Sequence, residues 1–270
     1  MMRAAAHQVS GHFGELMQGR LGRDGPIALI SLPCAALNVT AWRRPGRHLA
    51  LHGARLLSPQ RARLFLRSLG LSLRAPVQIR ANIMAGSGAG SSTAALVALA
   101  RVAGWQGDPA ELARACVVSE GATDPLMFAQ AERLLWASRQ AVVLDQLPAL
   151  PKFEIVGGFY GPGQRTDAKD QNFPDISDLL QDWRRAADLE TLAQLASVSA
   201  SRTLALRHAW DDPTPELAKA TGALGYVIAH TGSARGLLFA PQTVPEVAQA
   251  ALRAAGFRGV LRFTAGGGKS

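Results

Sequence analysis

The first part of the chain alternates apolar runs with segments of helical periodicity. Apolar residues over 26–42 predict strands, which we expect to be broken at Pro33. Residues 59–69 predict a basic helix, and the alternation over 76–83 predicts a further strand. The segment 92–103 is apolar on nearly every face, so it predicts a helix that is buried all round.

Capping and turn residues divide the chain after this helix. The sequence D-P-A-E at 108–111 predicts a helix start, with Asp as the N-cap, Pro in the first position and Glu three residues after the cap. The pair D-P at 124–125 predicts the start of a third helix in the same way. The run A-V-V-L at 141–144 predicts a strand.

The proline-containing stretch at 147–151 predicts a boundary between two domains, residues 1–148 and 149–270. Beyond it the predicted order is strand, helices, strand, strand, helix, strand. These elements are expected at 153–160, 175–207 with 214–224, 226–230, 236–239, 244–255 and 259–264. This order is typical of a ferredoxin-like α+β sandwich.

Composition narrows the class of protein. The 270 residues are 48% hydrophobic and 18% charged, which indicates a globular chain and excludes a disordered one. Cys34 and Cys116 fit neither a metal spacing nor a disulfide framework. The N-terminal residues lack the apolar region of a signal peptide, and no run reaches the roughly 18 apolar residues of a membrane helix. We therefore expect a soluble, cytoplasmic protein.

The net charge of +9 favours anionic partners. Most of the basic residues are arginines that are spread along the chain, and the densest group, R-R-P-G-R at 43–47, contains no aromatic residue. Nucleic-acid surfaces usually show clustered basic residues with interleaved aromatics or a known module. We expect no nucleic-acid or membrane partner, but a small-molecule partner and a monomer or homodimer.

A glycine-rich stretch, G-S-G-A-G-S-S-T at 86–93, leads into the predicted buried helix. Glycines allow backbone N–H groups to close on phosphate oxygens, and a helix N-terminus favours anions. The dinucleotide-binding fingerprint fails at Ser91, which stands where its third small residue should be. The C-terminal G-G-G-K-S fails as a Walker A sequence, because its first position would be Phe263 and no helix can follow Ser270. A tight turn packed only on protein stays the alternative.

This stretch resembles the phosphate motif of the GHMP kinases, the family of galactokinase, homoserine kinase and mevalonate kinase. Two further segments resemble that family's other motifs: G-E-L-M-Q-G at 14–19 and A-H-T-G-S-A-R-G-L-L-F at 229–239. The resemblance implies an α+β GHMP kinase fold. Its N-terminal domain would be a nucleotide-binding domain like domain 2 of ribosomal protein S5, and its C-terminal domain would be ferredoxin-like. It also implies ATP and Mg²⁺ as cofactors.

The resemblance also implies roles for particular residues. Asp124 is the candidate catalytic base, with Mg²⁺ ligation and helix capping as its other possible roles, and Ser92 and Glu120 are the candidate Mg²⁺ ligands. The residues implied to bind the cofactor are Gly86, Ser87, Gly88, Ala89, Gly90, Ser91, Ser92 and Thr93. The residues implied to bind the substrate are Glu15, Gln18, Thr231, Gly232 and Ser233.

Glu15 is a candidate partner for an ammonium group of the substrate, and Arg235 or Arg165 for its carboxylate. His12 and His230 flank the motifs and receive no catalytic role.

Within the family, four segments together resemble the L-threonine kinases, which make O-phospho-L-threonine for cobalamin synthesis. They are S-G-H-F-G-E-L-M-Q-G, G-A-G-S-S-T-A, S-E-G-A-T-D and A-H-T-G-S-x-x-G. Ser10 and Phe13 replace a proline and a cysteine usual in that subgroup, and Met84 stands about where a proline is usual. The alternatives are a homoserine kinase or other GHMP kinase, a nucleotide-binding paralogue without catalysis, and a Rossmann oxidoreductase, which the failed fingerprint disfavours.

Overall fold

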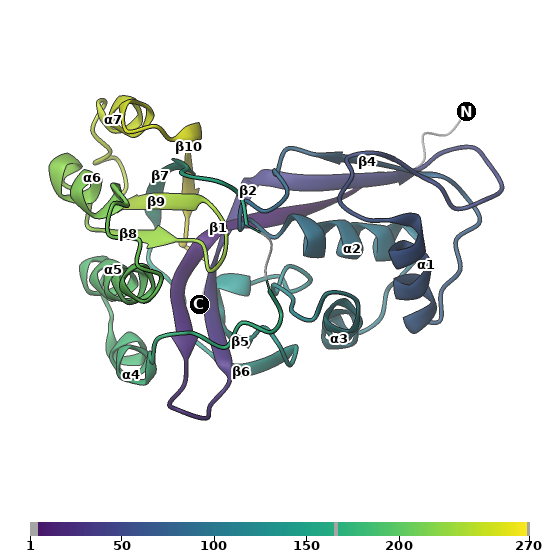
Figure 1. Cartoon of the computed structure of the whole chain (residues 1–270), viewed down its shortest axis with the longest axis horizontal. Helices are drawn as coiled ribbons and strands as arrows, with labels where there is room; N and C mark the ends of the chain where they lie inside the picture. The colour runs from purple at the N-terminus through teal and green to yellow at the C-terminus, as the bar shows by residue number, and fades with distance from the viewer. Residues whose placement is uncertain (1–4, 165–166, 269–270) are drawn as a thin grey trace.

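The computed structural model describes residues 5–164 and 167–268, and its strands form one sheet (Figure 1). The strand order is β10-β7-β9-β8-β1-β2-β4-β3, and β5 joins β2 to β6 off this path. The strands are β1 (His7–Arg20), β2 (Ile27–Arg43), β3 (Leu51–Gly53), β4 (Val77–Ala81), β5 (Leu134–Ala137), β6 (Val142–Gln146), β7 (Phe153–Phe159), β8 (Gly225–Ile228), β9 (Ala234–Phe239) and β10 (Arg258–Ala265). The sheet therefore runs without a break from one end of the molecule to the other.

The long antiparallel pair β1–β2 runs through the middle of the molecule (Figure 1). The sequence does not predict β1, because most of its residues are buried on both faces and show no alternation. The predicted break at Pro33 is wrong, since β2 continues through this residue. Pro33 lies opposite His12, where the pairing shifts in register, and a proline without an N–H is tolerated in such irregular places.

Helices pack on both halves of this sheet. They are α1 (Pro59–Ser68), α2 (Ser91–Val102), α3 (Pro109–Glu120), α4 (Ser177–Arg185), α5 (Leu189–Leu206), α6 (Thr214–Thr221) and α7 (Ala248–Ala254), with a short 3₁₀ turn, η1 (Ala131–Arg133). As predicted, α2 is buried nearly all round and packs against β1 and β2. Helix α5 packs on β1 and β8, and α7 packs on β7 and β10.

Capping explains several helix boundaries. Asp108 accepts a hydrogen bond from the backbone N–H of Ala110 at the start of α3, as predicted. The predicted helix at 124–125 is wrong, because the chain makes only a turn there, with Phe128 N–H donating to Pro125 O at 3.1 Å. The carboxylate of Asp124 faces the His12 side chain of β1, with Oδ1 3.5 Å from Nε2.

The second half of the chain has the predicted order of strand, helices, strand, strand, helix and strand. The sheet continues across the predicted boundary at 147–151, because β1 pairs with β8. Helix α5 adds a second link, since the backbone N–H of Gln18 in β1 donates to Ser199 Oγ at 2.9 Å. The division into residues 1–148 and 149–270 stays a prediction.

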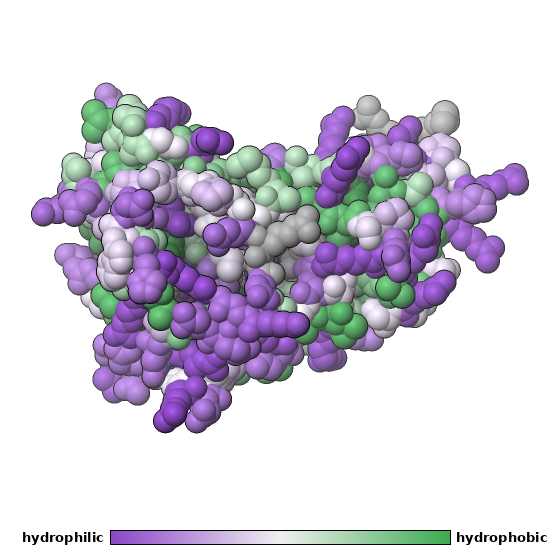
Figure 2. All heavy atoms as spheres, in the orientation of Figure 1, coloured by the Kyte–Doolittle hydropathy of each residue, from purple (hydrophilic) through white to green (hydrophobic). Residues whose placement is uncertain are grey.

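Hydrophilic side chains gather at the lower left of the molecule, over α4 and the turn between β1 and β2 (Figure 2). Ion pairs lie in this region: Arg202 contacts Asp178 at 2.6 Å and Arg184 contacts Asp145 at 2.6 Å. Among the described residues, no helix is long and apolar enough to span a membrane.

Candidate functional site

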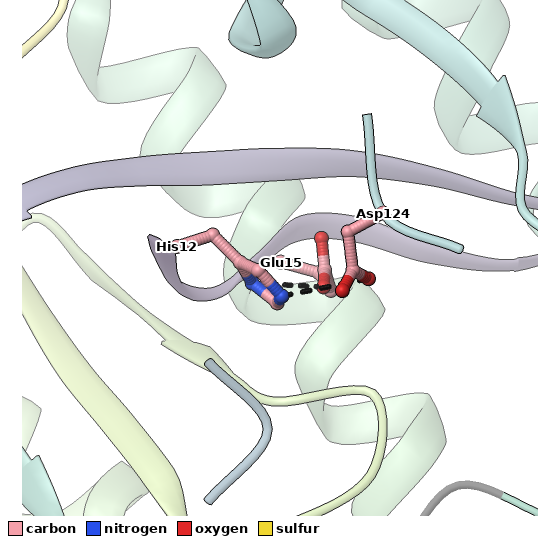
Figure 3. Close-up of side chains that lie close together, drawn as sticks. All are labelled: His12, Glu15 and Asp124. Atoms are coloured by element: carbon pink, nitrogen blue, oxygen red, sulfur yellow. Dashed lines mark ion pairs between the residues drawn. The ribbon is translucent and has the colours of Figure 1, made fainter. Parts of the chain in front are cut away.

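A bulge in β1 brings two polar side chains to the same side. Residues three apart on a regular strand point to opposite faces. Between His12 and Glu15 the pairing with β2 shifts in register, and Gly14 has a φ of 77°. Both side chains therefore enter one buried space, where His12 Nδ1 lies 3.3 Å from Glu15 Oε1 (Figure 3).

The glycine-rich loop brings an uncapped helix N-terminus to this space. Gly86, Gly88 and Gly90 have φ values of 76°, 72° and 73°, a region that residues with a Cβ rarely adopt. Within the described chain no side chain caps the first N–H groups of α2. A Cβ at Gly90 would lie 2.8 Å from His12 Cδ2 and 3.1 Å from Asp124 Oδ2. Free N–H groups and a helix dipole at this point form a binding place for an anion such as phosphate.

Backbone hydrogen bonds hold the loop from three directions. The donors are Gln164 N–H to Gly86 O (2.8 Å), Ser233 N–H to Ser87 O (3.1 Å), Ala234 N–H to Ser87 O (3.0 Å) and His12 N–H to Ala89 O (3.3 Å). The hydroxyl of Ser87 points back into the loop and donates to Met84 O at 2.7 Å. Loop geometry is thus fixed by the first and third motif segments as well as by its own glycines.

Glu120 ends α3 beside the first turn of α2. Its Oε1 accepts hydrogen bonds from the hydroxyl of Ser92 and the guanidinium of Arg61, and its Oε2 accepts from Thr93 Oγ1 at 3.4 Å. Burial raises the pKa of Glu120, although the hydrogen bond from Ser92 and the charge of Arg61 oppose this shift. Gly121 follows in the left-handed conformation, which ends the helix at this carboxylate.

Asp124 lies on the loop between α3 and β5, and neighbouring bonds fix its position. The N–H of Thr123 donates to Ser138 O at 2.9 Å, and the indole N–H of Trp136 donates to Thr123 O at 2.7 Å. Asp124 Oδ1 then lies 3.5 Å from His12 Nε2, and the carboxylates of Glu15 and Asp124 lie beside one another next to the ring of His12 (Figure 3).

The three side chains shift one another's pKa values. Burial would lower the pKa of His12, but the charges of Glu15 and Asp124 outweigh it and raise that pKa to about 9. Burial raises the pKa of Glu15 to about 8. Burial would also raise the pKa of Asp124, but the charge and hydrogen bond of His12 bring it below its ordinary value. At neutral pH, Asp124 is therefore the charged carboxylate, His12 its cation and Glu15 mostly protonated.

The third motif forms the turn between β8 and β9, which closes over the glycine-rich loop. A Cβ at Gly88 would lie 2.0 Å from Thr231 O, and a Cβ at Gly232 would lie 2.4 Å from Gly88 N. Glycine in both places lets two backbones touch. The neighbouring His230 is partly buried, and its ring stacks on Phe173 with centroids 4.4 Å apart.

A cavity of about 250 Å³ joins these segments. Most of the predicted site residues line it: Glu15, Gly86, Gly88, Ala89, Gly90, Ser91, Ser92, Thr93, Glu120, Asp124 and Thr231. Ser87, Gln18, Gly232 and Ser233 are not in its wall. Gln18 is buried, and its amide donates to Ile228 O at 3.1 Å, so its observed contact is within the sheet and not on the substrate side.

Several residues of the cavity wall were not predicted as site residues, among them His12, Arg61, Arg139 and His230. The two histidines stand next to motif glycines, and this position was the available signal. The arginines gave no signal, because isolated arginines are common in this chain. Of the two arginines predicted to meet a substrate carboxylate, Arg235 is paired with Asp212 at 2.8 Å, and Arg165 lies outside the described residues.

Comparison with solved structures shows which fold this chain has. Mevalonate kinase from Methanococcus jannaschii aligns with a TM-score of 0.66 and 11% identity, over 97% of this chain and 98% of that one. Phosphomevalonate kinase from Streptococcus pneumoniae aligns with a TM-score of 0.63 and 14% identity, over 98% of this chain and 100% of that one. Homoserine kinase from Cytophaga hutchinsonii aligns with a TM-score of 0.54 and 15% identity, over 98% of this chain and 95% of that one. The chain has the GHMP kinase fold.

At the level of sequence, no family model and no curated protein matches the chain. The predicted α+β class is consistent with the mixed sheet and helices, and the likeness of fold extends over nearly the whole chain. Identities of 11–15% fix the fold and leave the reaction to be argued from the site.

The donor atoms at the end of α3 fit Mg²⁺. This ion prefers oxygen ligands, usually one or two carboxylates with substrate phosphates and water. Ser92 Oγ and the Glu120 carboxylate are in contact at the edge of the anion-binding N-terminus, and both line the cavity. His12, Glu15 and Asp124 also have ligand atoms within 4.8 Å of one another, but each imidazole nitrogen of His12 already faces its own carboxylate.

Proposed function

We propose that this protein is an ATP-dependent kinase that transfers the γ-phosphoryl group to the hydroxyl of a small molecule, with L-threonine as the leading acceptor. The product would then be O-phospho-L-threonine, the compound used for the side chain of cobalamin. One observation supports this most directly: an uncapped helix N-terminus, a carboxylate with hydroxyl neighbours and a charged aspartate all line the same cavity.

Each of these groups has a separate task in phosphoryl transfer. Residues 86–93 would hold the phosphates of ATP through backbone N–H groups, with Ser92 and Glu120 beside them holding Mg²⁺. Bound Mg²⁺ would neutralise charge on the transferring group. Arg61 now pairs with Glu120 and lines the cavity, so it can turn to a phosphate when the carboxylate binds the ion.

Asp124 would accept the proton of the acceptor hydroxyl. A base must be deprotonated at working pH, and His12 favours the charged form of Asp124. The ring of His12 also fixes the direction of this carboxylate, since its other nitrogen is held by Glu15. His12 is therefore a positioning residue in this proposal.

The acceptor is tested by ADP release with MgATP and L-threonine, L-serine, L-homoserine or no acceptor. We expect turnover that strongly favours L-threonine. We expect the Asp124→Asn variant to lose about 10²- to 10⁴-fold in kcat and to keep its affinity for MgATP. A preference for L-homoserine would keep the kinase and replace the acceptor.

Two other outcomes would reject the kinase. Binding of MgATP without turnover on any hydroxyl compound would favour a nucleotide-binding paralogue that does not catalyse. Thermal stabilisation by NADH and not by ATP would favour an oxidoreductase.

A further inference from the structure

Three side chains in the cavity wall have buried polar atoms without a partner among the described residues. They are Oε2 of Glu15, Nε and Nη1 of Arg139, and both ring nitrogens of His230. Buried polar groups in folded proteins almost always have hydrogen-bond partners, and unpaired ones destabilise the fold. Unpaired groups that line one cavity therefore indicate the polar ligand that the cavity accepts.

Of the described arginines that line the cavity, Arg55 is exposed and Arg61 is ion-paired, whereas Arg139 has buried N–H groups without a partner among the described residues. Arg61 is paired with Glu120, Arg235 with Asp212 at 2.8 Å, and Arg207 with Asp170 at 2.5 Å. Arg139 donates through Nη2 to the backbone oxygen of Asp167 at 3.0 Å and has no ion pair within the described parts of the chain. Its Nε and Nη1 groups lie on either side of Nη2 and remain as two separate N–H donors for oxygen atoms of an anion such as a carboxylate or phosphate.

His230 lies close to Arg139 and cannot neutralise it. Burial lowers the pKa of His230 to about 3, and the charge of Arg139 contributes to this shift. The ring is therefore neutral, with one N–H donor and one acceptor nitrogen. Arg139, His230 and Asp124 all line the cavity.

We propose that Arg139 and His230 bind a carboxylate of the acceptor, while Asp124 receives its hydroxyl. This inference rests on the proposed kinase function and adds the residues that hold the acceptor's carboxylate. The same guanidinium chemistry would suit a phosphate of the nucleotide. Because residues 86–93 already supply an anion site at the start of α2, the acceptor's carboxylate is the source to which we assign Arg139.

The test is a binding comparison that does not depend on turnover. L-threonine, L-serine, L-homoserine and their carboxamides are titrated by calorimetry into wild type and Arg139→Gln, in the presence of Mg²⁺ and a non-hydrolysable ATP analogue. We expect wild type to bind at least one amino acid about 10- to 100-fold more tightly than its amide. In Arg139→Gln this ratio should fall close to one, with the affinity for the nucleotide analogue unchanged. Arg184→Gln, at an exposed ion pair far along the chain, is the matched control.

Several results would overturn the inference. One is an equal amino acid to amide ratio in wild type and Arg139→Gln; another is the absence of binding by any carboxylate-bearing compound. Weaker nucleotide binding by Arg139→Gln with an unchanged ratio would assign the arginine to a phosphate instead. If the ratio changes as expected but no phosphate is transferred to any acceptor, the carboxylate site stands and the kinase function fails. Thermal unfolding of Arg139→Gln confirms that the variant is folded.

Discussion

A single imidazole ring links the two carboxylates of the site. His12 faces Glu15 through Nδ1 and Asp124 through Nε2; His12 and Glu15 are buried, and Asp124 is partly buried. A buried charge is tolerated only when it is paired, so the arrangement at neutral pH is one cation, one anion and a mostly protonated carboxyl. The negative charge of Asp124, the proposed base, therefore depends on His12, which comes from a different part of the chain.

This arrangement predicts how stability depends on pH. The unfolded chain releases the protons of Glu15 and His12 near their ordinary pKa values of 4.5 and 6.5, whereas the folded protein holds them up to about 8 and 9. From pH 6.5 to 8 the folded state therefore binds more protons, and the free energy of unfolding falls as the pH rises. Each retained proton contributes up to about 1.4 kcal/mol per pH unit.

Urea unfolding of wild type at pH 6.5, 7.25 and 8 measures this slope. In His12→Gln we expect about half of the wild-type decrease in unfolding free energy per pH unit, because Glu15 still retains its proton. The control is His52→Gln at an exposed position, which should keep the full slope. A slope of zero in wild type, or one unchanged in His12→Gln, would contradict the described charges. Below pH 6.5, His230 acts with the opposite sign, because its folded pKa is lowered.

These contacts explain which residues of the site could be predicted from the sequence. The glycines and hydroxyls of 86–93 act through the local backbone and helix start, so a contiguous pattern reveals them. Glu120 and Asp124 were placed by resemblance, and both line the cavity. The position of His12 depends on the bulge at Gly14, and Arg139 shares the cavity with His230, from the other half of the chain; neither relation has a local signal in the sequence. Gln18 keeps its motif position but points into the sheet.

At the scale of elements, the glycine-rich loop and the turn between β8 and β9 form one backbone unit. Ser87 O accepts two N–H groups of the turn, and the two chains approach too closely for a Cβ at Gly88. The helix predictions for α1, α2, α3 and α5 succeeded where periodicity or capping is local, and the one at 124–125 failed because a long-range contact took its capping side chain. The loop therefore depends on an element more than 130 residues away.

Gly88→Ala tests this unit. Its Cβ would lie 2.0 Å from Thr231 O at a φ of 72°, so the turn must move away from the loop. We expect a loss of about tenfold or more in affinity for MgATP, and a lower melting temperature. Gly70→Ala is the matched control, because it has a φ of 67° and no atom within 4 Å of the added Cβ. The control should show only the backbone strain of about 1–2 kcal/mol; equal effects of the two substitutions on MgATP affinity would show that the contact is unimportant.

At the scale of the molecule, the cavity is built from both predicted domains. Glu15, Glu120 and Asp124 come from 1–148, whereas Gln164, His230 and Thr231 come from 149–270. The order of elements in the second half was predictable because each has its own apolar period. The joining of the two halves was not, since it depends on β1, whose burial on both faces hides its period. A shared sheet makes joint unfolding of the halves the expected behaviour.

Thermal unfolding with and without nucleotide tests this coupling and the domain boundary together. A ligand at 100 times its dissociation constant stabilises the folded state by about 2.7 kcal/mol. For a chain of this size that corresponds to a rise of about 5–10 °C in the melting temperature. We expect one transition by calorimetry, moved as a whole by MgATP and little by MgAMP, which lacks the phosphates that residues 86–93 would hold. Two transitions, of which MgATP moves only one, would instead mean that 1–148 and 149–270 unfold independently, and would place the nucleotide's contacts in a single half.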